Sequence, residues 1–315
     1  MTDHSQFDRD SAQAGAHGKG EFGHVSVLLK PAIDFLNIHR GGTYVDGTVG
    51  LGGHSFEIAK RLGRQGHLIG FDKDPAALDG ARKRLSEVPA ELAQDWPKVT
   101  LLHASFASLA EHVEPGSANG VLADLGVSSM QFEDAARGFS FQAEGRLDMR
   151  MDPQAELTAY QVVNQADERT LADLIYEFGE ERRSRRIARA IVRARPITTT
   201  AELARVVAAA ARPVKFQRIH PATLTFQAIR IYVNRELDDL KALLEAAPGV
   251  LAKAGRLVII SFHSLEDRIV KDALREGARQ GLYEVLTRKP VVATEEEIAV
   301  NPRSRSAKLR AAERN

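Results

Sequence analysis

The chain has 315 residues, of which 43% are hydrophobic and 27% are charged, and its formal net charge is +1. This length and hydrophobic content suffice for a large packed core, and without cysteine the chain can hold neither a disulfide nor a cysteine-ligated metal. Residues 1–22 lack the apolar run of a secretory signal or a membrane span, so we expect a disordered tail and a cytoplasmic protein.

From residue 43 onward, short β-rich segments alternate with helical patterns. Strands are predicted at Thr43–Asp46, His67–Asp72, 99–103 and 120–125, and helices at 55–62 and 75–85. The alternation predicts an α/β, Rossmann-like fold with a mostly parallel sheet between helices. Asp46, Asp72 and Asp124 stand at strand ends, and open parallel sheets bind ligands beyond the carboxyl ends of their strands. We therefore expect three carboxylates along one edge of the sheet.

The alternation stops after Asp124. The next buried strand is predicted only at 256–262, after a long helical pattern at 225–251. Between them, apolar residues recur at helical spacing in three stretches, represented by Leu171, Ile187 and Leu203, and Pro213 is expected to end the third helix. We predict a helical substrate-recognition insert at 136–215, placed within a discontinuous domain formed by 23–135 and 216–315.

Arginines crowd one part of this predicted insert. They are Arg182, Arg183, Arg185, Arg186, Arg189, Arg193 and Arg195. The cluster is typical of a polyanion-binding face, but it is equally typical of a solvated helix face paired with the nearby Glu177, Glu180 and Glu181. Both interpretations stay open at this point.

A glycine-rich turn, DGTVGLGGH at 46–54, joins the first predicted strand to the first helix. Its glycines allow the backbone to approach a ligand, although a purely structural tight turn has the same composition. Asp72 follows Gly52 by 20 residues, where a carboxylate suits the hydroxyls of a ribose. A dinucleotide is disfavoured because the third fingerprint glycine is missing and because Asp46 would repel a pyrophosphate. Asp46 could instead hold the ammonium group of S-adenosylmethionine, which makes this methyl donor the favoured ligand.

The fourth predicted strand leads into VLADLGVSS at 121–129. Its Asp124 would lie where a methyl donor and a methyl acceptor meet. A catalytic role and a loop-capping role are both compatible with such an aspartate.

These and other segments together resemble a known family. The matching segments are HVSVLL (24–29), DGTVGLGGH (46–54), DLGVSS (124–129), RGFSF (137–141), LDMRMD (147–152), GEER (179–182), HPAT (220–223), TFQAIR (225–230), SFHSLEDR (261–268) and NPRSRS (301–306). The sequence resembles the bacterial 16S rRNA cytosine-N4-methyltransferases of the RsmH/MraW family over nearly all of its length after residue 23. Leu224 departs from the arginine of the family's pattern.

The resemblance implies a class I S-adenosylmethionine-dependent methyltransferase with an inserted all-helical domain, acting on a cytidine in the decoding region of 16S rRNA within the small ribosomal subunit. It implies that Gly52, Gly53 and His54 contact the donor, Asp72 the ribose and Phe106 the adenine, with Asp124 and Gln131 nearest the sulfonium. No metal is expected, and a monomer and a homodimer are both compatible. Asp124 is the candidate catalytic residue.

Two further side chains, Asn234 and His263, are expected to face the same crevice, and His263 precedes a capping-box-like helix start. Two rival functions remain at this point. One is an NAD(P)-dependent oxidoreductase; the other is a non-catalytic RNA-binding assembly factor that keeps the nucleotide-binding fold as a scaffold.

Overall fold

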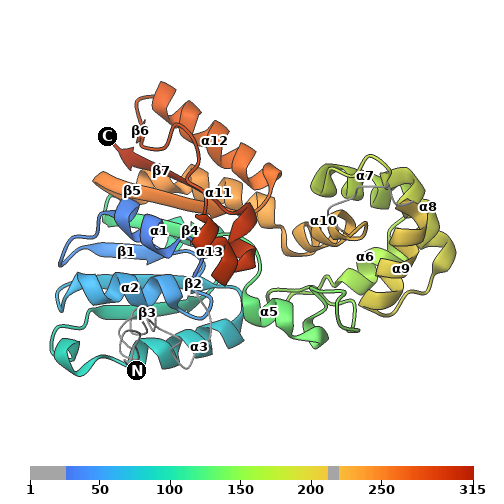
Figure 1. The fold of residues 1–315 in the computed structure, drawn as a ribbon. Helices are drawn as coiled ribbons and strands as arrows, with labels where there is room; N and C mark the ends of the chain where they lie inside the picture. Colours follow the sequence, from blue (N-terminus) through green and yellow to red (C-terminus); the bar gives the residue numbers. More distant parts are fainter. Residues whose placement is uncertain (1–25, 212–219) are drawn as a thin grey trace, which may run out of the picture.

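A seven-stranded sheet organises one of the two lobes of the chain, in the order β3-β2-β1-β4-β5-β7-β6 (Figure 1). The computed structural model describes residues 26–211 and 220–315. The strands are β1 (Thr43–Asp46), β2 (His67–Asp72), β3 (Lys98–His103), β4 (Ala118–Asp124), β5 (Leu251–Ser261), β6 (Tyr283–Val285) and β7 (Lys308–Arg314). β1 to β5 pair in parallel, and β7 runs antiparallel between β5 and β6.

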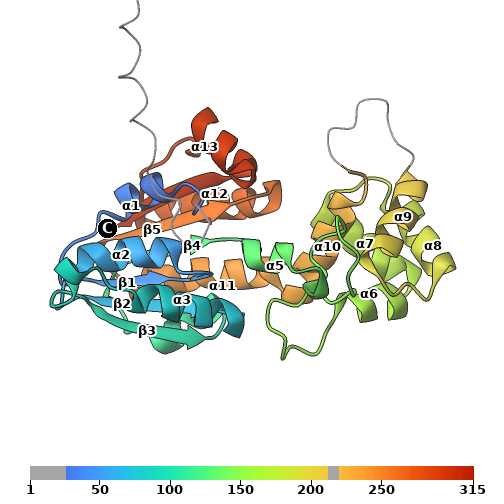
Figure 2. The same cartoon turned by 60° about the horizontal axis from the view of Figure 1, so that its bottom comes forward.

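Helices cover both faces of this sheet (Figures 1 and 2). They are α1 (Leu29–Leu36), α2 (Gly53–Leu62), α3 (Pro75–Ser86), α4 (Leu109–His112), α11 (Glu236–Val250) and α12 (Ser264–Arg279). Side chains alternate across β4, so that Leu122 packs with α1 to α3 while Val121 packs with α4, α11 and α12. This alternation is the two-residue period of a strand buried on both faces.

Four of the five predicted strands agree closely with the structure, whereas β5, predicted at 256–262, begins five residues earlier at Leu251. β1 and β2 have the predicted bounds, and β3 and β4 begin one and two residues before the predicted positions. The helical pattern at 225–251 was wrong as a single helix, because α10 (Thr223–Asn234) and α11 are separate. Arg235 breaks them with a left-handed backbone at φ 53°. Apolar residues continue on both sides of the break, so hydrophobic spacing alone does not reveal it.

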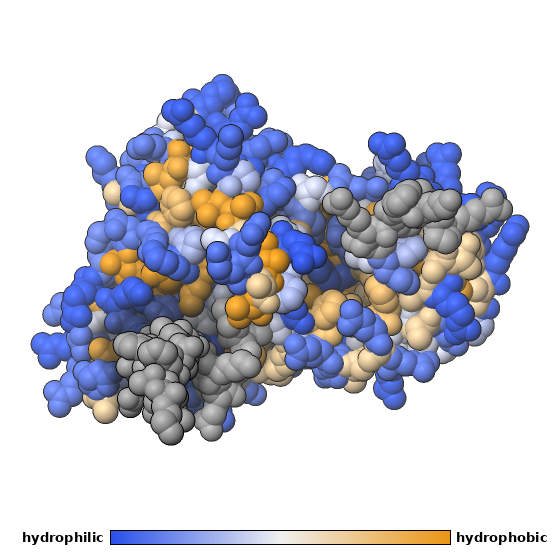
Figure 3. Space-filling model, in the orientation of Figure 1, coloured by the Kyte–Doolittle hydropathy of each residue, from blue (hydrophilic) through white to orange (hydrophobic). Residues whose placement is uncertain are grey.

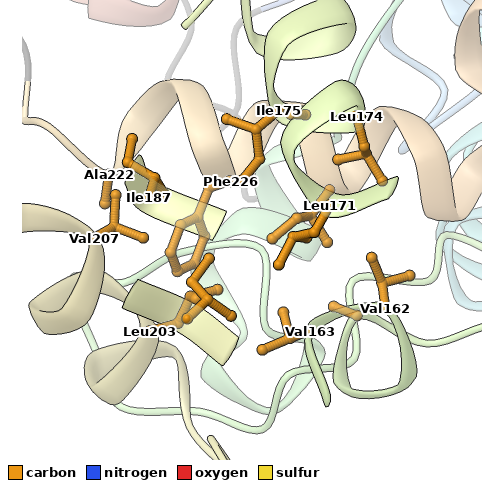
Figure 4. Packing of buried hydrophobic residues seen from close by; sticks show 14 of the residues in the cluster. Val162, Val163, Leu171, Leu174, Ile175, Ile187, Leu203, Val207, Ala222 and Phe226 are labelled. Carbon is orange, nitrogen blue, oxygen red and sulfur yellow. The ribbon is translucent and has the colours of Figure 1, made fainter. Parts of the chain in front are cut away.

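The second lobe is helical, with a hydrophobic core of its own. It contains α6 (Ala159–Gln165), α7 (Glu168–Gly179), α8 (Ser184–Ala194), α9 (Thr200–Ala211) and α10. Phe226 of α10 points toward Leu203 of α9 inside this core (Figure 4). The helical core therefore extends past residue 215. The predicted tail at 1–22 and the helix-ending Pro213 lie outside the described residues.

The two lobes are joined through short elements and direct contacts. The chain passes from the sheet to the helices through α5 (Ser129–Glu133) and η3 (Ala135–Arg137), and returns through α10 and α11 (Figure 2). Asn234 fixes the crossing, since its side-chain Nδ2 donates to Met149 O at 2.7 Å and its Oδ1 accepts from Met151 N at 2.6 Å. Glu180 at the end of α7 pairs with Arg268 of α12 at 3.0 Å.

Hydrophilic side chains cover most of the face seen in Figure 3. No helix among the described residues is both long enough and apolar enough to span a membrane. The remaining short elements are η1 (Ala90–Leu92), η2 (Phe106–Ser108), α13 (Glu295–Val300) and η4 (Pro302–Ser306).

Candidate active site

A cavity of about 380 Å³ opens at the carboxyl edge of the sheet. Its walls come from the segments that follow β1, β2, β4 and β5, from the α10–α11 junction and from η4. This is the edge at which ligands bind in open parallel sheets. The cavity therefore brings together residues that are 280 positions apart in the sequence, from Ser26 to Ser306.

The glycine-rich turn forms one wall of the cavity and is tied to the strands beside it. Gly47 N donates to Leu122 O at 2.7 Å, and Val49 N donates to Phe71 O at 3.0 Å. The Thr48 hydroxyl accepts from the backbone N of Asp124 at 2.6 Å. These bonds hold the turn against β2 and β4, so its backbone is fixed before any ligand arrives.

The three residues expected to contact the donor at the start of α2 have different surroundings. Gly53 and His54 line the cavity, and a Cβ at Gly53 would collide with the Ser26 hydroxyl. Gly52 does not line the cavity; at φ +78° it faces α3, where a Cβ would lie 3.3 Å from Ala81 Cα. Its glycine character serves the turn and the packing of α2 on α3.

Asp46 has no contact with the cavity. Its carboxylate is fully buried, accepting from the Ser55 hydroxyl at 2.6 Å and from Thr48 N at 3.1 Å. Burial raises the pKa of Asp46 to about 6, although both hydrogen bonds oppose this shift. The expectation that Asp46 holds the ammonium group of the donor is therefore wrong, because its oxygens point inward and shape the turn.

Asp72 lines the cavity at the end of β2. Its two oxygens accept from Gly50 N at 2.7 Å and from Asp74 N at 2.9 Å. Burial raises its pKa to about 6, while these two hydrogen bonds act in the opposite direction. Because a carboxylate oxygen has more than one lone pair, each can also accept a hydroxyl from a ribose. Phe106, at the start of η2, lines the same cavity.

Asp124 offers an unsatisfied acceptor. Its Oδ1 is buried and has no hydrogen-bond partner among the described residues. Burial, followed by the nearby carboxylates of Asp46 and Glu266, raises the pKa of Asp124 well above its ordinary value. Because Oδ1 is covered by protein, a hydrogen-bond donor or a cation bound in the cavity would meet the exposed part of the Asp124 side chain, which is 22% exposed and lines the cavity.

Gln131 also lines the cavity, but its amide is used within the protein. Its Oε1 accepts from Ser128 N at 2.9 Å as part of a capping box at the start of α5. Its Nε2 donates to Asp74 at 2.9 Å, and Asp74 also pairs with Arg137 at 2.7 Å. A donor contact by Gln131 stays a prediction, and the structure gives it a positioning role.

Three residues that sequence reasoning did not select also line the cavity: Arg230, Glu236 and Glu266. Arg230 and Glu236 form a two-pronged ion pair at 2.8 Å and 2.8 Å. Burial alone would raise the pKa of Glu266, but the neighbouring His263 and Arg230 hold it below its ordinary value. Side-chain atoms that could coordinate a metal ion lie within 4.8 Å of one another in Glu236, His263 and Glu266. The Arg230 guanidinium supplies positive charge beside Glu236 and Glu266.

His263 and Asn234, expected to face the crevice, do not line the cavity. His263 is the N-cap of α12, in a capping box with Glu266, as the sequence pattern predicted. Asn234 instead joins the lobes, as described above. Family motifs contain Arg230 and Glu266, but their partners come from distant segments, so no local pattern assigned them a role.

The exposed arginines of α8 are not paired with Glu177, Glu180 or Glu181, as the interpretation of a solvated helix face requires. Glu180 pairs with Arg268, and buried Glu181 accepts from Arg183 N at 2.8 Å. The exposed arginines of α8 are Arg185, Arg186, Arg189 and Arg193, and exposed Arg182 precedes the helix. Of these, only Arg189 forms an ion pair with another described residue, Glu168, at 3.2 Å. The result is a largely uncompensated positive surface on the helical lobe.

Comparisons with known proteins find similarity over almost the whole chain. The model of the MraW methylase family matches residues 21–315. A protein of Koribacter versatilis named ribosomal RNA small subunit methyltransferase H is 68% identical, with 97% of this chain and 98% of that protein covered. A protein of the same name from Acidobacterium capsulatum is 66% identical, over 92% and 98%. Among solved structures, an rRNA methylase from Streptococcus thermophilus has 13% identity and a TM-score of 0.41, covering 92% and 98%.

Proposed function

The chain belongs to the MraW methylase family, and from this premise we propose that it transfers a methyl group from S-adenosylmethionine to the N4 amine of a cytidine in the decoding region of 16S rRNA. It is a class I methyltransferase by its sheet, in which β7 runs antiparallel between β5 and β6. The small ribosomal subunit is the proposed form of the substrate, and the cytoplasm the proposed place of the reaction.

The donor fits the wall formed by the glycine-rich turn, Asp72 and Phe106. Gly53 and His54 offer close backbone approach, the Asp72 oxygens can accept ribose hydroxyls, and the Phe106 ring can pack against adenine. When bound, S-adenosylmethionine supplies a methyl group that its sulfonium has already activated. The protein therefore has to position the reactants and to exclude water.

The Asp124 carboxylate is the proposed acceptor for an N–H of the target amine, and its partly exposed position in the cavity wall at the end of β4 is the single observation on which the catalytic assignment rests. A cytosine amine is a weak nucleophile because its lone pair is delocalised into the ring. A hydrogen bond accepted from that amine localises the lone pair, and fixed alignment with the methyl group removes entropic cost. Asp124 also contributes negative charge near a cationic donor.

RNA binding is assigned to the helical lobe. The exposed side chains of α8 carry uncompensated positive charge, and phosphate contacts by arginine dominate the affinity of RNA-binding surfaces. A base in folded RNA must be unstacked before it can enter a cavity. We propose that the 136–215 insert, together with α10 from its core, holds the RNA while one base enters the cavity.

The two rival functions predict different ligands and products. An NAD(P)-dependent oxidoreductase would have to accommodate a pyrophosphate beside the Asp72 and Asp124 carboxylates, which repel it. A non-catalytic assembly factor would bind RNA without transferring a methyl group.

The deciding experiment incubates the protein with methyl-labelled S-adenosylmethionine and small ribosomal subunits that lack the modification. Nucleoside analysis of the RNA follows. Appearance of N4-methylcytidine at one position would support the proposal. RNA binding without methyl transfer would favour the assembly factor, and binding of NAD(P) with no affinity for the donor would favour the oxidoreductase.

A further inference from the structure

Four cationic side chains line the active-site cavity, and they differ in how they are neutralised. Lys73 pairs with Asp239 at 2.6 Å, and Arg230 pairs with Glu236 at 2.8 Å. Arg84 lies at the donor end, where its Nη1 would be 3.6 Å from a Cβ at Gly53. The fourth, Arg303, comes from η4 near the C-terminal end of the chain, and its one ion-pair partner within residues 26–211 and 220–315 is an exposed carboxylate.

The Arg303 guanidinium is held in place mainly by neutral groups. It lies 5.1 Å from the centre of the Phe132 ring, and its Nη1 donates to the Ser129 hydroxyl. Its nearest carboxylate is Glu133 at 3.6 Å, whose side chain is 76% exposed. Ion pairs with such exposed groups contribute little free energy. Partial burial lowers the pKa of Arg303 despite Glu133, and its side chain is still 35% exposed, so the guanidinium is open to an anion in the cavity and has no strong counter-charge.

Further hydrogen-bonding groups line the same cavity. These are the hydroxyls of Ser128, Ser129 and Ser306 and the side chain of Asn301. The turn that carries Arg303 is itself fixed, because Asn301 Oδ1 accepts from Arg303 N at 3.3 Å and Asn301 O accepts from the Ser304 hydroxyl at 2.7 Å. A guanidinium with adjacent hydroxyls matches the oxygens of a phosphate group.

The proposed reaction identifies the anion. A target base can reach Asp124 only if its own ribose and phosphate follow it to the cavity. We propose that Arg303, with the hydroxyls of Ser129 and Ser306, binds a phosphate group of the nucleotide whose base is methylated. This inference rests on the proposed function and adds a subsite for the acceptor that lies outside the donor site.

The test compares cytidine with cytidine 5′- and 3′-monophosphates, titrated into the protein saturated with S-adenosylhomocysteine. The wild-type protein is expected to bind one monophosphate about tenfold more tightly than cytidine, consistent with a charge-assisted contact. Arg303→Ala should reduce this preference to less than twofold and leave cytidine affinity unchanged. Arg303→Lys keeps the charge but loses the planar fork, so part of the preference should remain.

Arg305→Ala is the matched control, since Arg305 lies on the same η4, is exposed and does not line the cavity. It should keep the wild-type preference. Loss of S-adenosylmethionine affinity in Arg303→Ala with the phosphate preference intact would overturn the proposal and assign the guanidinium to the donor carboxylate. Equal binding of cytidine and both monophosphates by the wild-type protein would also overturn it. Failure of the proposed function would be distinguishable from failure of the phosphate subsite, because the wild-type protein would then not methylate small subunits at all.

Discussion

The Nδ1 atom of His54 lies 3.7 Å from Oδ2 of Asp124. The other ring nitrogen, Nε2, lies 3.1 Å from the carbonyl oxygen of Val27. Because a carbonyl can only accept, Nε2 carries the hydrogen and Nδ1 is the atom that faces Asp124. The turn after β1 and the end of β4 thus meet through these two side chains.

Asp124→Asn is expected to lower kcat by about 100-fold or more, as removal of one charge-stabilising group does in other active sites. Donor affinity should change by less than about tenfold, since Asp72 and the glycine-rich turn remain. Methyl transfer to small subunits and calorimetric titration of the donor measure the two effects. A variant that binds the donor normally and retains full turnover would remove Asp124 from the acceptor role.

The pH dependence of turnover tests the same residue. Burial and nearby carboxylates raise the pKa of Asp124, so its ionised form is present above that raised pKa and is lost as the pH falls. Turnover should therefore decrease toward low pH in the wild-type enzyme. In Asp124→Asn the low residual rate should lack this decrease. An unchanged acidic limb in the variant would assign the limb to another group.

Donor binding should weaken at low pH because of Asp72. Its pKa is raised to about 6, so the carboxylate that we propose accepts the ribose hydroxyls is ionised above pH 6 and protonated below it. The Kd for S-adenosylhomocysteine, which lacks the sulfonium charge, is expected to rise about tenfold between pH 7.5 and pH 5. Asp72→Asn should bind more weakly at every pH and lose this dependence. A Kd independent of pH in the wild-type protein would contradict the ribose assignment.

Charge reversal on α8 tests the RNA-binding surface. Arg185, Arg186 and Arg189 changed together to glutamate should weaken small-subunit binding at least tenfold and flatten its dependence on salt. The matched control reverses three exposed cations of the sheet lobe, Lys241, Lys253 and Arg275. Filter binding at several salt concentrations compares the two. Equal losses of affinity in both variants would mean that only net charge matters, and α8 would then be a solvated helix face with no role in RNA binding.

A substitution in the helical core tests whether that lobe unfolds separately. Phe226→Ala removes a ring that is 4% exposed, so a loss of about 3–5 kcal/mol is expected. The sheet lobe has separate hydrophobic clusters, so donor affinity should stay within about threefold. Hydrogen exchange should show the loss of protection confined to α6–α10. Loss of protection throughout β1–β5 as well would indicate that the chain is one cooperative unit.

The sheet was predictable because its strands carry local signals. Buried apolar segments ending in Asp46, Asp72 and Asp124 marked three of the strands and placed all three residues at one edge. The orientation of Asp46 was not predictable, since it depends on Ser55 one helical turn into α2. Gly52 likewise faces Ala81 only because α2 packs against α3. Both are tertiary effects that a strand-end pattern does not contain.

The acceptor side of the cavity could not be derived from local patterns. Arg230, Glu236 and Arg303 come to line the same cavity as Asp124 only through the return of the chain after the helical lobe and through η4. The break at Arg235 decides which side chains reach the cavity, and a left-handed arginine has no sequence signature comparable to glycine. The resemblance to the RsmH/MraW family identified the segments that contain Arg230 and Arg303, but it did not indicate where their side chains lie in space.

The break at Arg235 has a mechanical consequence. Arg230 belongs to a helix of the helical core, whereas Glu236 begins α11, which packs on the sheet; their two-pronged ion pair joins the lobes inside the cavity. Any rotation of the helical lobe about the α10–α11 junction must carry Arg230 with it and displace or break that pair. The proposed RNA-binding surface on α8 would thereby be coupled to the charge and shape of the cavity in which we propose that the base is methylated.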